Sequence, residues 1–153
     1  MNLWIIYSNT FGYSKMISEI FESQLEEYFN VSVGNAEIVK PSLVIDEKPD
    51  FIIFGEFIRK NSLNPITKWI EEFYILLKFN NISIKKVATY YIVPGNLDIN
   101  DTGVKTMSKY FPAESIFSKP LVLKINTFNG SLDKETYTLI TKYVKHLIIF
   151  FFN

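Results

Sequence analysis

The chain has 153 residues, of which 48% are hydrophobic and 16% aromatic, enough apolar material for one domain with a sizeable core. Sixteen Lys and Arg residues balance sixteen Asp and Glu residues, so no net charge favours nucleic acid or an anionic membrane as a partner. The absence of cysteine excludes disulfides and thiolate chemistry, and the single histidine argues against a zinc site or a Ser-His-Asp triad. We therefore predict a single domain over residues 1–153, without a metal site or a nucleic-acid partner.

Five segments have the character of β-strands, and three of them contain the nearly continuous apolar runs WIIY, FIIF and VATYYIV. Such runs are typical of strands buried on both faces of a parallel sheet. The five predicted strands are Leu3 to Tyr7, Val31 to Val39, Phe51 to Gly55, Lys86 to Val93 and Leu121 to Ile125.

Helical patterns separate these strands. Apolar residues recur with a helical period from Met16 to Tyr28 and from Tyr137 to Ile148, and a weaker helix is predicted between Asp101 and Tyr110. Asn64-Pro65 is typical of a cap followed by proline at the first helical position. The apolar stripe behind it consists of Ile66, Trp69, Ile70, Phe73 and Leu77. Alternating strands and helices, without a linker or a repeat, predict an α/β three-layer sandwich around a five-stranded parallel sheet.

Three unusual loops follow strands of this sheet. In an open parallel sheet, ligands bind beyond the carboxyl ends of the strands where the winding direction reverses, which for the strand order 2-1-3-4-5 is between strands one and three. Strand one is followed by SNTFGYS and strand three by GEFIRKN, and Pro94-Gly95-Asn96 after strand four would flank the same crevice. We predict that a ligand site forms from these loops.

The loop after strand one has the chemistry of an anion cradle. Its residues offer hydroxyl groups, an amide and, at Gly12, close backbone approach, and the following helix adds free N–H groups and the positive end of its dipole. An ordinary turn with a helix cap explains the same residue types, so the loop alone leaves both interpretations open. No Walker A lysine and no G-x-G-x-x-G motif is present, which disfavours a nucleoside triphosphate and a dinucleotide.

The loop SNTFGYS resembles the phosphate-binding loop of flavodoxins, with Gly12 and Ser14 in place and Asn9 and Phe11 where hydroxyl residues are usual. DFIIFGEFIRKN is similar to the segment D-x-[IV]-[IV]-x-G-[AS]-x-I-R-x-G of the flavodoxin-domain group that includes menaquinone-dependent protoporphyrinogen oxidase. FNGSLDKETYTLITKYV resembles that group's closing segment and last helix. The three segments come in the family's order and span nearly the whole chain.

The chain departs from this pattern at several places. Glu56 stands where the group has a small residue, Asn61 replaces a glycine and Lys134 replaces a tyrosine. Residues 96–119 carry no obvious basic insertion of the kind associated with the oxidase. FMN binding is therefore the firmer expectation from the resemblance, ahead of the haem-pathway activity.

The resemblance implies a flavodoxin-like fold that binds FMN noncovalently and passes electrons. It implies a 5′-phosphate site at Ser8, Asn9, Thr10, Phe11, Gly12, Tyr13 and Ser14. It implies that one side of the isoalloxazine ring is lined by Glu56, Phe57, Ile58, Arg59, Lys60 and Asn61, and the other by Pro94, Gly95 and Asn96. Aromatic rings pair well with a flat π-system, which makes Tyr13 and Phe57 candidates to stack on the ring or lie at its edge.

Further expectations concern the tuning of the cofactor. In flavodoxin-like proteins, a backbone group of the second loop contacts the ring nitrogen N5, and Asn61 in place of glycine would restrict its movement. Arg59 either points inward, where it would stabilise the anionic reduced ring and raise its potential, or is a solvated loop residue. Tyr90 or Tyr91, at the end of strand four, is a candidate to border the ligand.

Other functions compete with an FMN-dependent electron carrier. A response-regulator receiver domain needs an acidic pair after strand one and an aspartate after strand three, where this chain has Tyr7-Ser8 and Gly55-Glu56. The enzymatic alternative is a flavodoxin-type protoporphyrinogen dehydrogenase with a quinone acceptor, and a third is a flavodoxin fold that has lost its cofactor and acts as a binding module. The expected partners are redox proteins or a small-molecule or quinone acceptor.

The sequence also bears on location. Residues 1–7 lack the basic segment and the cleavage site of a signal peptide, which favours the cytoplasm. The apolar tail from Leu147 to Phe152 is far shorter than the roughly 20 residues of a membrane-spanning helix. We expect it to pack on the sheet, with peripheral contact with a membrane as the alternative.

Overall fold

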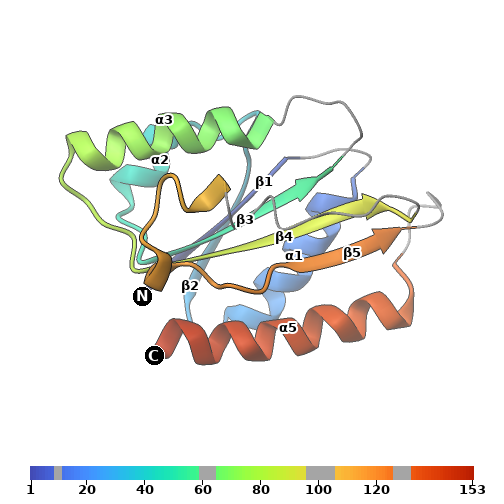
Figure 1. Ribbon diagram of the computed structural model, residues 1–153. Helices are drawn as coiled ribbons and strands as arrows, with labels where there is room; N and C mark the ends of the chain where they lie inside the picture. Colours follow the sequence, from blue (N-terminus) through green and yellow to red (C-terminus); the bar gives the residue numbers. More distant parts are fainter. Residues whose placement is uncertain (9–11, 59–64, 96–105, 126–131) are drawn as a thin grey trace.

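The computed structural model describes residues 1–8, 12–58, 65–95, 106–125 and 132–153, and it has a five-stranded sheet at its centre (Figure 1). The sheet order is β2-β1-β3-β4-β5, and every neighbouring pair is parallel. The strands are β1 (Asn2–Tyr7), β2 (Asn30–Asn35), β3 (Phe51–Phe57), β4 (Lys86–Pro94) and β5 (Leu121–Ile125). The predicted α/β class and strand order are confirmed.

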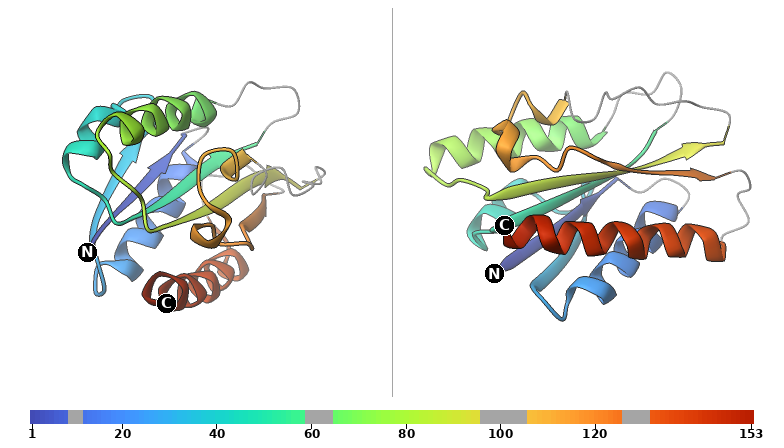
Figure 2. Two further views of the ribbon diagram at one scale, coloured as in Figure 1. Left: turned by 60° about the vertical axis from the view of Figure 1, so that its left-hand side comes forward. Right: turned by 60° about the horizontal axis from the view of Figure 1, so that its bottom comes forward.

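Helices cover both faces of the sheet, which makes the three layers visible edge-on in Figure 2. α1 (Tyr13–Leu25) and α5 (Lys134–Phe152) lie on one face, and α2 (Pro41–Asp46) and α3 (Pro65–Phe79) lie on the other. A short 3-10 turn, η1 (Ala113–Ser115), precedes β5. The sequence did not predict α2, because six residues are too few to display a helical period.

The core consists of two apolar clusters, one on each face of the sheet. Successive residues of β1 alternate between them: Leu3 and Ile5 face α1 and α5, whereas Trp4 and Ile6 face α2 and α3. β3 alternates in the same way, with Phe51 and Ile53 on the first face and Ile52 and Phe54 on the second. The continuous apolar runs in the sequence follow from this burial on both faces.

α3 buries the predicted stripe completely. Ile66, Trp69, Ile70, Phe73 and Leu77 are all buried. The Trp69 indole stacks on the Phe73 ring at 5.1 Å between centroids, and its Nε1–H donates to the Val39 carbonyl at 2.8 Å. Pro65 is the first helical residue, as predicted, and Asn64 lies outside the described residues.

Several predicted boundaries are wrong. The second strand ends at Asn35 rather than Val39, because the Asn35 carbonyl accepts the N–H groups of Ile38 and Val39 in a tight turn. α1 ends at Leu25, which leaves Tyr28 outside the helix and 48% exposed. Tyr137 is likewise 49% exposed and does not belong to the buried face of α5. Of the weak helix predicted from residue 101 to 110, only residues 106 and 107 are helical within the described part.

The end of α5 packs on the sheet, as expected from its apolar sequence. Leu147 and Phe151 are buried, and the Phe151 ring stacks on the Phe51 ring with centroids 4.8 Å apart. Ile149 and Phe152 face outward and are exposed. None of the helices in the described ranges combines the length and apolarity needed to cross a membrane.

Candidate functional site

The carboxyl ends of β1, β3 and β4 lie at one edge of the sheet, here called the carboxyl edge (Ser8, Gly55–Ile58, Pro94 and Gly95). The Ser8 N–H donates to the Gly55 carbonyl at 3.0 Å, and the Ile58 N–H donates to the Ile92 carbonyl at 2.8 Å. The Gly95 N–H donates to the Ile125 carbonyl at 3.1 Å. These bonds continue the sheet one residue beyond β1, β3 and β4, so the starts of the three predicted loops lie side by side.

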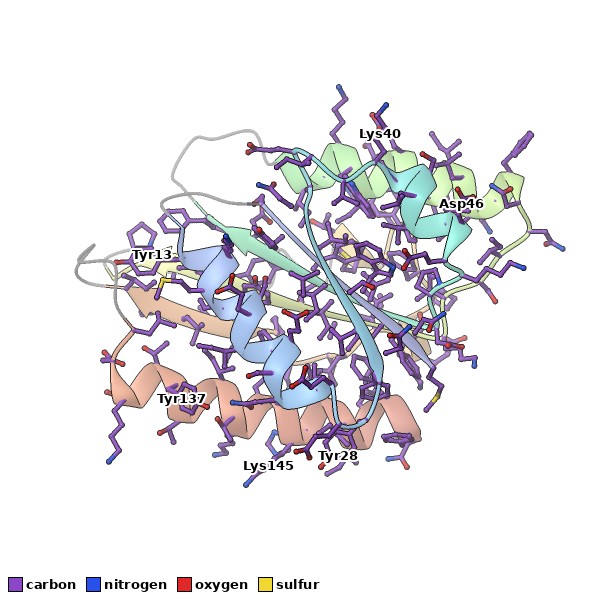
Figure 3. All side chains as sticks on the ribbon, turned by 180° about the vertical axis from the view of Figure 1, so that it is seen from behind. Tyr13, Tyr28, Lys40, Asp46, Tyr137 and Lys145 are labelled. Carbon is purple, nitrogen blue, oxygen red and sulfur yellow. The ribbon has the colours of Figure 1, made fainter. Side chains whose placement is uncertain are left out.

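The structure describes part of the predicted site. Ser8, Gly12, Tyr13, Ser14, Glu56, Phe57, Ile58, Pro94 and Gly95 are described. Outside the described residues lie Asn9, Thr10, Phe11, Arg59, Lys60, Asn61 and Asn96. Figure 3 views α1 from behind, with Tyr13 at the end of the helix near the carboxyl edge and Tyr28 beyond the opposite end.

Gly12 is the residue that caps the start of α1. Its φ of 78° is in the left-handed region that favours glycine, and a Cβ built there would meet no atom of the described residues within 4 Å. The Gly12 carbonyl accepts the first bond of the helix from the Met16 N–H at 3.1 Å. The amides of the first helical turn precede this bond and find no acceptor within the helix, an arrangement that suits an anion.

Ser14 places a buried hydroxyl group in this first turn. The residue is fully buried, and no hydrogen-bond partner for its Oγ exists in the structure as described. An unsatisfied buried hydroxyl costs about 1–3 kcal/mol, which a ligand oxygen at hydrogen-bond distance would recover. The helix cap is a glycine and makes no side-chain cap bond, so the ordinary capped turn does not explain this serine. The arrangement fits a phosphate group.

Glu56 is a buried carboxyl group in the carboxyl edge. It lies opposite Tyr91 in the β3–β4 pairing, on the face that carries Ile52 and Phe54, and its side chain is 4% exposed. Burial raises the pKa of Glu56 to about 8, and no hydrogen bond or opposite charge from the described residues offsets the burial. The group is therefore mainly protonated at neutral pH, where it can donate a hydrogen bond or release a proton.

Tyr91 shares this environment. Burial raises its pKa to about 12, opposed by a side-chain hydrogen bond with Thr89 and reinforced by the neighbouring Glu56 carboxyl group. The phenol therefore keeps its proton at physiological pH. Tyr90 is also buried but faces the opposite side of the sheet, toward α1. The two adjacent tyrosines thus serve different faces, a distinction that periodicity left open.

The candidates for ring stacking lie in the core. Tyr13 and Phe57 are both buried in the cluster between the sheet and the α1–α5 layer. Their burial favours a packing role for both rings over the predicted stacking on a cofactor. Ile58, Pro94 and Gly95 are half-buried and lie at the surface of the carboxyl edge, where they can contact a ligand.

Sequence reasoning missed Ser18. Its side chain is fully buried in α1, and its Oγ lies 2.7 Å from the Tyr90 hydroxyl. The available signal was a second serine four residues after Ser14, on the apolar face of the helix. A polar residue at such a position requires a buried partner, and the sequence alone does not reveal which one.

The five-stranded parallel sheet with the order β2-β1-β3-β4-β5 defines a flavodoxin-like fold. Neither a protein-family model nor a curated protein sequence matches the chain. Solved structures do match. Flavodoxin 1 from Bacillus cereus has a TM-score of 0.72 and 14% identity, over 97% of this chain and 98% of that chain. Flavodoxin 2 from the same organism has a TM-score of 0.69 and 17% identity, over 99% and 97% of the two chains.

A domain of a larger protein matches equally well. Rubredoxin oxygen:oxidoreductase from Desulfovibrio gigas has a TM-score of 0.70 and 12% identity, over 97% of this chain and 36% of that chain. At these identities, the likeness establishes the fold. The resemblance to the protoporphyrinogen oxidase group remains a prediction from the sequence.

Proposed function

We propose that this protein binds FMN noncovalently and carries electrons. The observation that supports this most directly is the buried Ser14 hydroxyl, which has no partner among the described residues and lies in the first turn of α1, two residues after the left-handed Gly12. Both residues lie where the winding of a flavodoxin-like sheet reverses, which is the ligand position in such folds. Flavodoxins are among the solved structures that share this fold.

In this proposal the chain holds the phosphate without a basic side chain. The first-turn amides, the helix dipole and the Ser14 hydroxyl donate to the phosphate oxygens. The loop residues from Ser8 to Phe11 complete the cradle, as the sequence predicts. The half-buried Ile58, Pro94 and Gly95 contact the ring and keep water from it.

The redox chemistry is supplied by the flavin when it is bound. The protein orients the ring and provides a group that holds a proton close to it, the buried carboxyl of Glu56. Arg59 lies outside the described residues, and in an inward orientation it would add positive charge near the ring. We propose redox proteins, or a small-molecule or quinone acceptor, as electron partners, and the cytoplasm as the location.

The purified protein tests this function directly. We expect yellow protein with flavin absorption bands, FMN as the mass of the released cofactor, and tighter binding of FMN than of riboflavin, because only FMN carries the phosphate. Colourless protein that binds neither compound would contradict the proposal and favour a cofactor-free binding module. Oxidation of a porphyrinogen with a quinone acceptor would assign the enzymatic alternative.

A further inference from the structure

The Tyr90 side chain extends from β4 on the α1–α5 face of the sheet and contacts the first turn of α1. Its phenolic oxygen donates to the Ser14 carbonyl at 2.9 Å and lies 2.7 Å from Ser18 Oγ. Ser18 Oγ lies 2.8 Å from the same Ser14 carbonyl and can donate to it. All three residues are fully buried. A strand of the sheet is thus hydrogen-bonded to the helical turn that carries the unpartnered Ser14 hydroxyl.

Gly55 makes this crossing possible. Tyr90 and Gly55 are paired neighbours on β4 and β3, and a Cβ at Gly55 would lie 2.0 Å from Tyr90 Cζ and 2.2 Å from its hydroxyl oxygen. The phenol therefore lies directly over the glycine. From the helix side, the Phe21 ring stacks on Tyr90 with centroids 5.2 Å apart and planes 27° apart. Glycine below and phenylalanine above hold the hydroxyl group in one position.

The hydroxyl groups carry fewer protons than the contacts they make. Tyr90 and Ser18 bring one proton each to three contacts between oxygens. The Ser14 carbonyl lies within hydrogen-bond distance of both hydroxyls, 2.9 Å from Tyr90 and 2.8 Å from Ser18, so removing either hydroxyl takes away one of its two side-chain donors. Burial raises the pKa of the Tyr90 phenol, which stays protonated at physiological pH.

We propose that Tyr90 is a positioning residue of the anion site: through the Ser14 carbonyl, it fixes the first turn of α1 and strengthens that turn as a hydrogen-bond donor. The Ser14 carbonyl and the Lys15 N–H belong to the same peptide group. A hydrogen bond accepted by the carbonyl polarises the group and makes its N–H a stronger donor. Because this N–H belongs to the first turn, the effect is directed at an anion bound there.

This inference rests on the proposed function, since the bound anion is the phosphate of FMN. The test compares FMN with riboflavin in the Tyr90→Phe protein, which loses only the hydroxyl group. We expect the FMN dissociation constant to rise about three- to tenfold, the range of a lost hydrogen bond, and the riboflavin constant to stay unchanged. A purely structural role would weaken both ligands equally and would overturn the inference.

Tyr143→Phe is the matched control. Tyr143 is also buried in the α1–α5 cluster, packs edge-on against Phe21 and donates its hydroxyl hydrogen bond to the Thr89 carbonyl at 2.9 Å. This bond ends on β4 rather than on the first turn of α1. Tyr143→Phe should therefore cost stability comparable to Tyr90→Phe, with an unchanged ratio of FMN to riboflavin affinity.

A second variant and a second ligand keep the test independent of the flavin ring. Ser18→Ala should lower FMN affinity in the same direction, and it carries the test if Tyr90→Phe fails to fold. Inorganic phosphate should shift the amide NMR signals of Gly12 to Lys15 more weakly in either variant than in the wild type. If both variants keep the wild-type preference for FMN over riboflavin, the proposed role of Tyr90 is overturned and the proposed function stands. A wild type that binds neither FMN nor phosphate would overturn the proposed function with it.

Discussion

The two faces of the sheet differ in how their buried polar groups are paired. On the α1–α5 face, the hydroxyls of Tyr90, Ser18 and Tyr143 all find partners, and only the Ser14 hydroxyl lacks one in the described structure. On the α2–α3 face, Glu56 has no counter-charge from the described residues, and burial holds the pKa of its carboxyl near 8.

The α1–α5 face thus holds backbone groups in a fixed geometry, whereas the α2–α3 face carries a carboxyl group that can gain or lose a proton. Neutral hydroxyl groups whose hydrogen bonds are all formed hold the backbone in place at little electrostatic cost. A buried carboxyl group without a counter-charge is costly when ionised and responds to pH. The first face therefore suits the positioning of a ligand, and the second suits exchange of a proton near it.

We expect the largest effect from Gly55→Ala, which disturbs the packing of Tyr90 on the α1–α5 face. The new methyl group would overlap the Tyr90 ring, so the ring must move out of its packed position. We expect a loss of about 3 kcal/mol in the free energy of unfolding, measured by urea denaturation. The same substitution in a Tyr90→Leu background should cost much less. An equal cost in both backgrounds would mean that Tyr90 is not the residue displaced.

Glu56→Gln tests the second face through pH. The folded pKa of about 8 lies above the ordinary glutamate value of 4.5, so the folded wild type binds more protons than the unfolded chain and loses stability as pH rises between these values. The glutamine variant should lack this loss and be more stable than the wild type by about 2 kcal/mol at pH 6, with little difference at pH 4. Parallel stability–pH curves for the two proteins would show that the carboxyl titrates normally.

Gly12→Val tests whether the open space at the start of α1 is the ligand position. Valine at a φ of 78° is strained, by about 1–2 kcal/mol, and its side chain would enter the space next to the first turn. We expect the circular dichroism of the sheet and helices to persist while FMN affinity falls at least about tenfold, equivalent to 1.4 kcal/mol. FMN binding equal to that of the wild type would remove Gly12 from the site.

Arg59→Ala is expected to have the smallest effect, and it concerns a residue outside the described structure. If the side chain points inward, removing its charge should lower the midpoint potential of the bound cofactor by about 60 mV or less, a tenfold change in a one-electron equilibrium. Thermal unfolding serves as the control and should change little. An unshifted potential would assign Arg59 to solvent.

The chain alone carries enough information for the fold and for a prediction of where a ligand would bind. The apolar runs of β1, β3 and β4 can be accommodated only in a sheet covered on both faces, and the stripe from Ile66 to Leu77 requires a helix packed on that sheet. Once the strands are parallel, the loop with Gly12 and Ser14 must emerge at the winding reversal. These features depend on local periodicity and on chain order, which a sequence displays.

Tertiary structure decided the rest, because contacts between distant residues leave no periodic signal. Nothing in the sequence pairs Tyr90 with Ser14 and Ser18, more than 70 positions away, or explains Gly55 by the ring that lies over it. Nor does it show that Tyr13 and Phe57 are buried or that Glu56 is inaccessible to water. Burial depends on how the layers close over each strand end, and that closure exists only in the folded molecule.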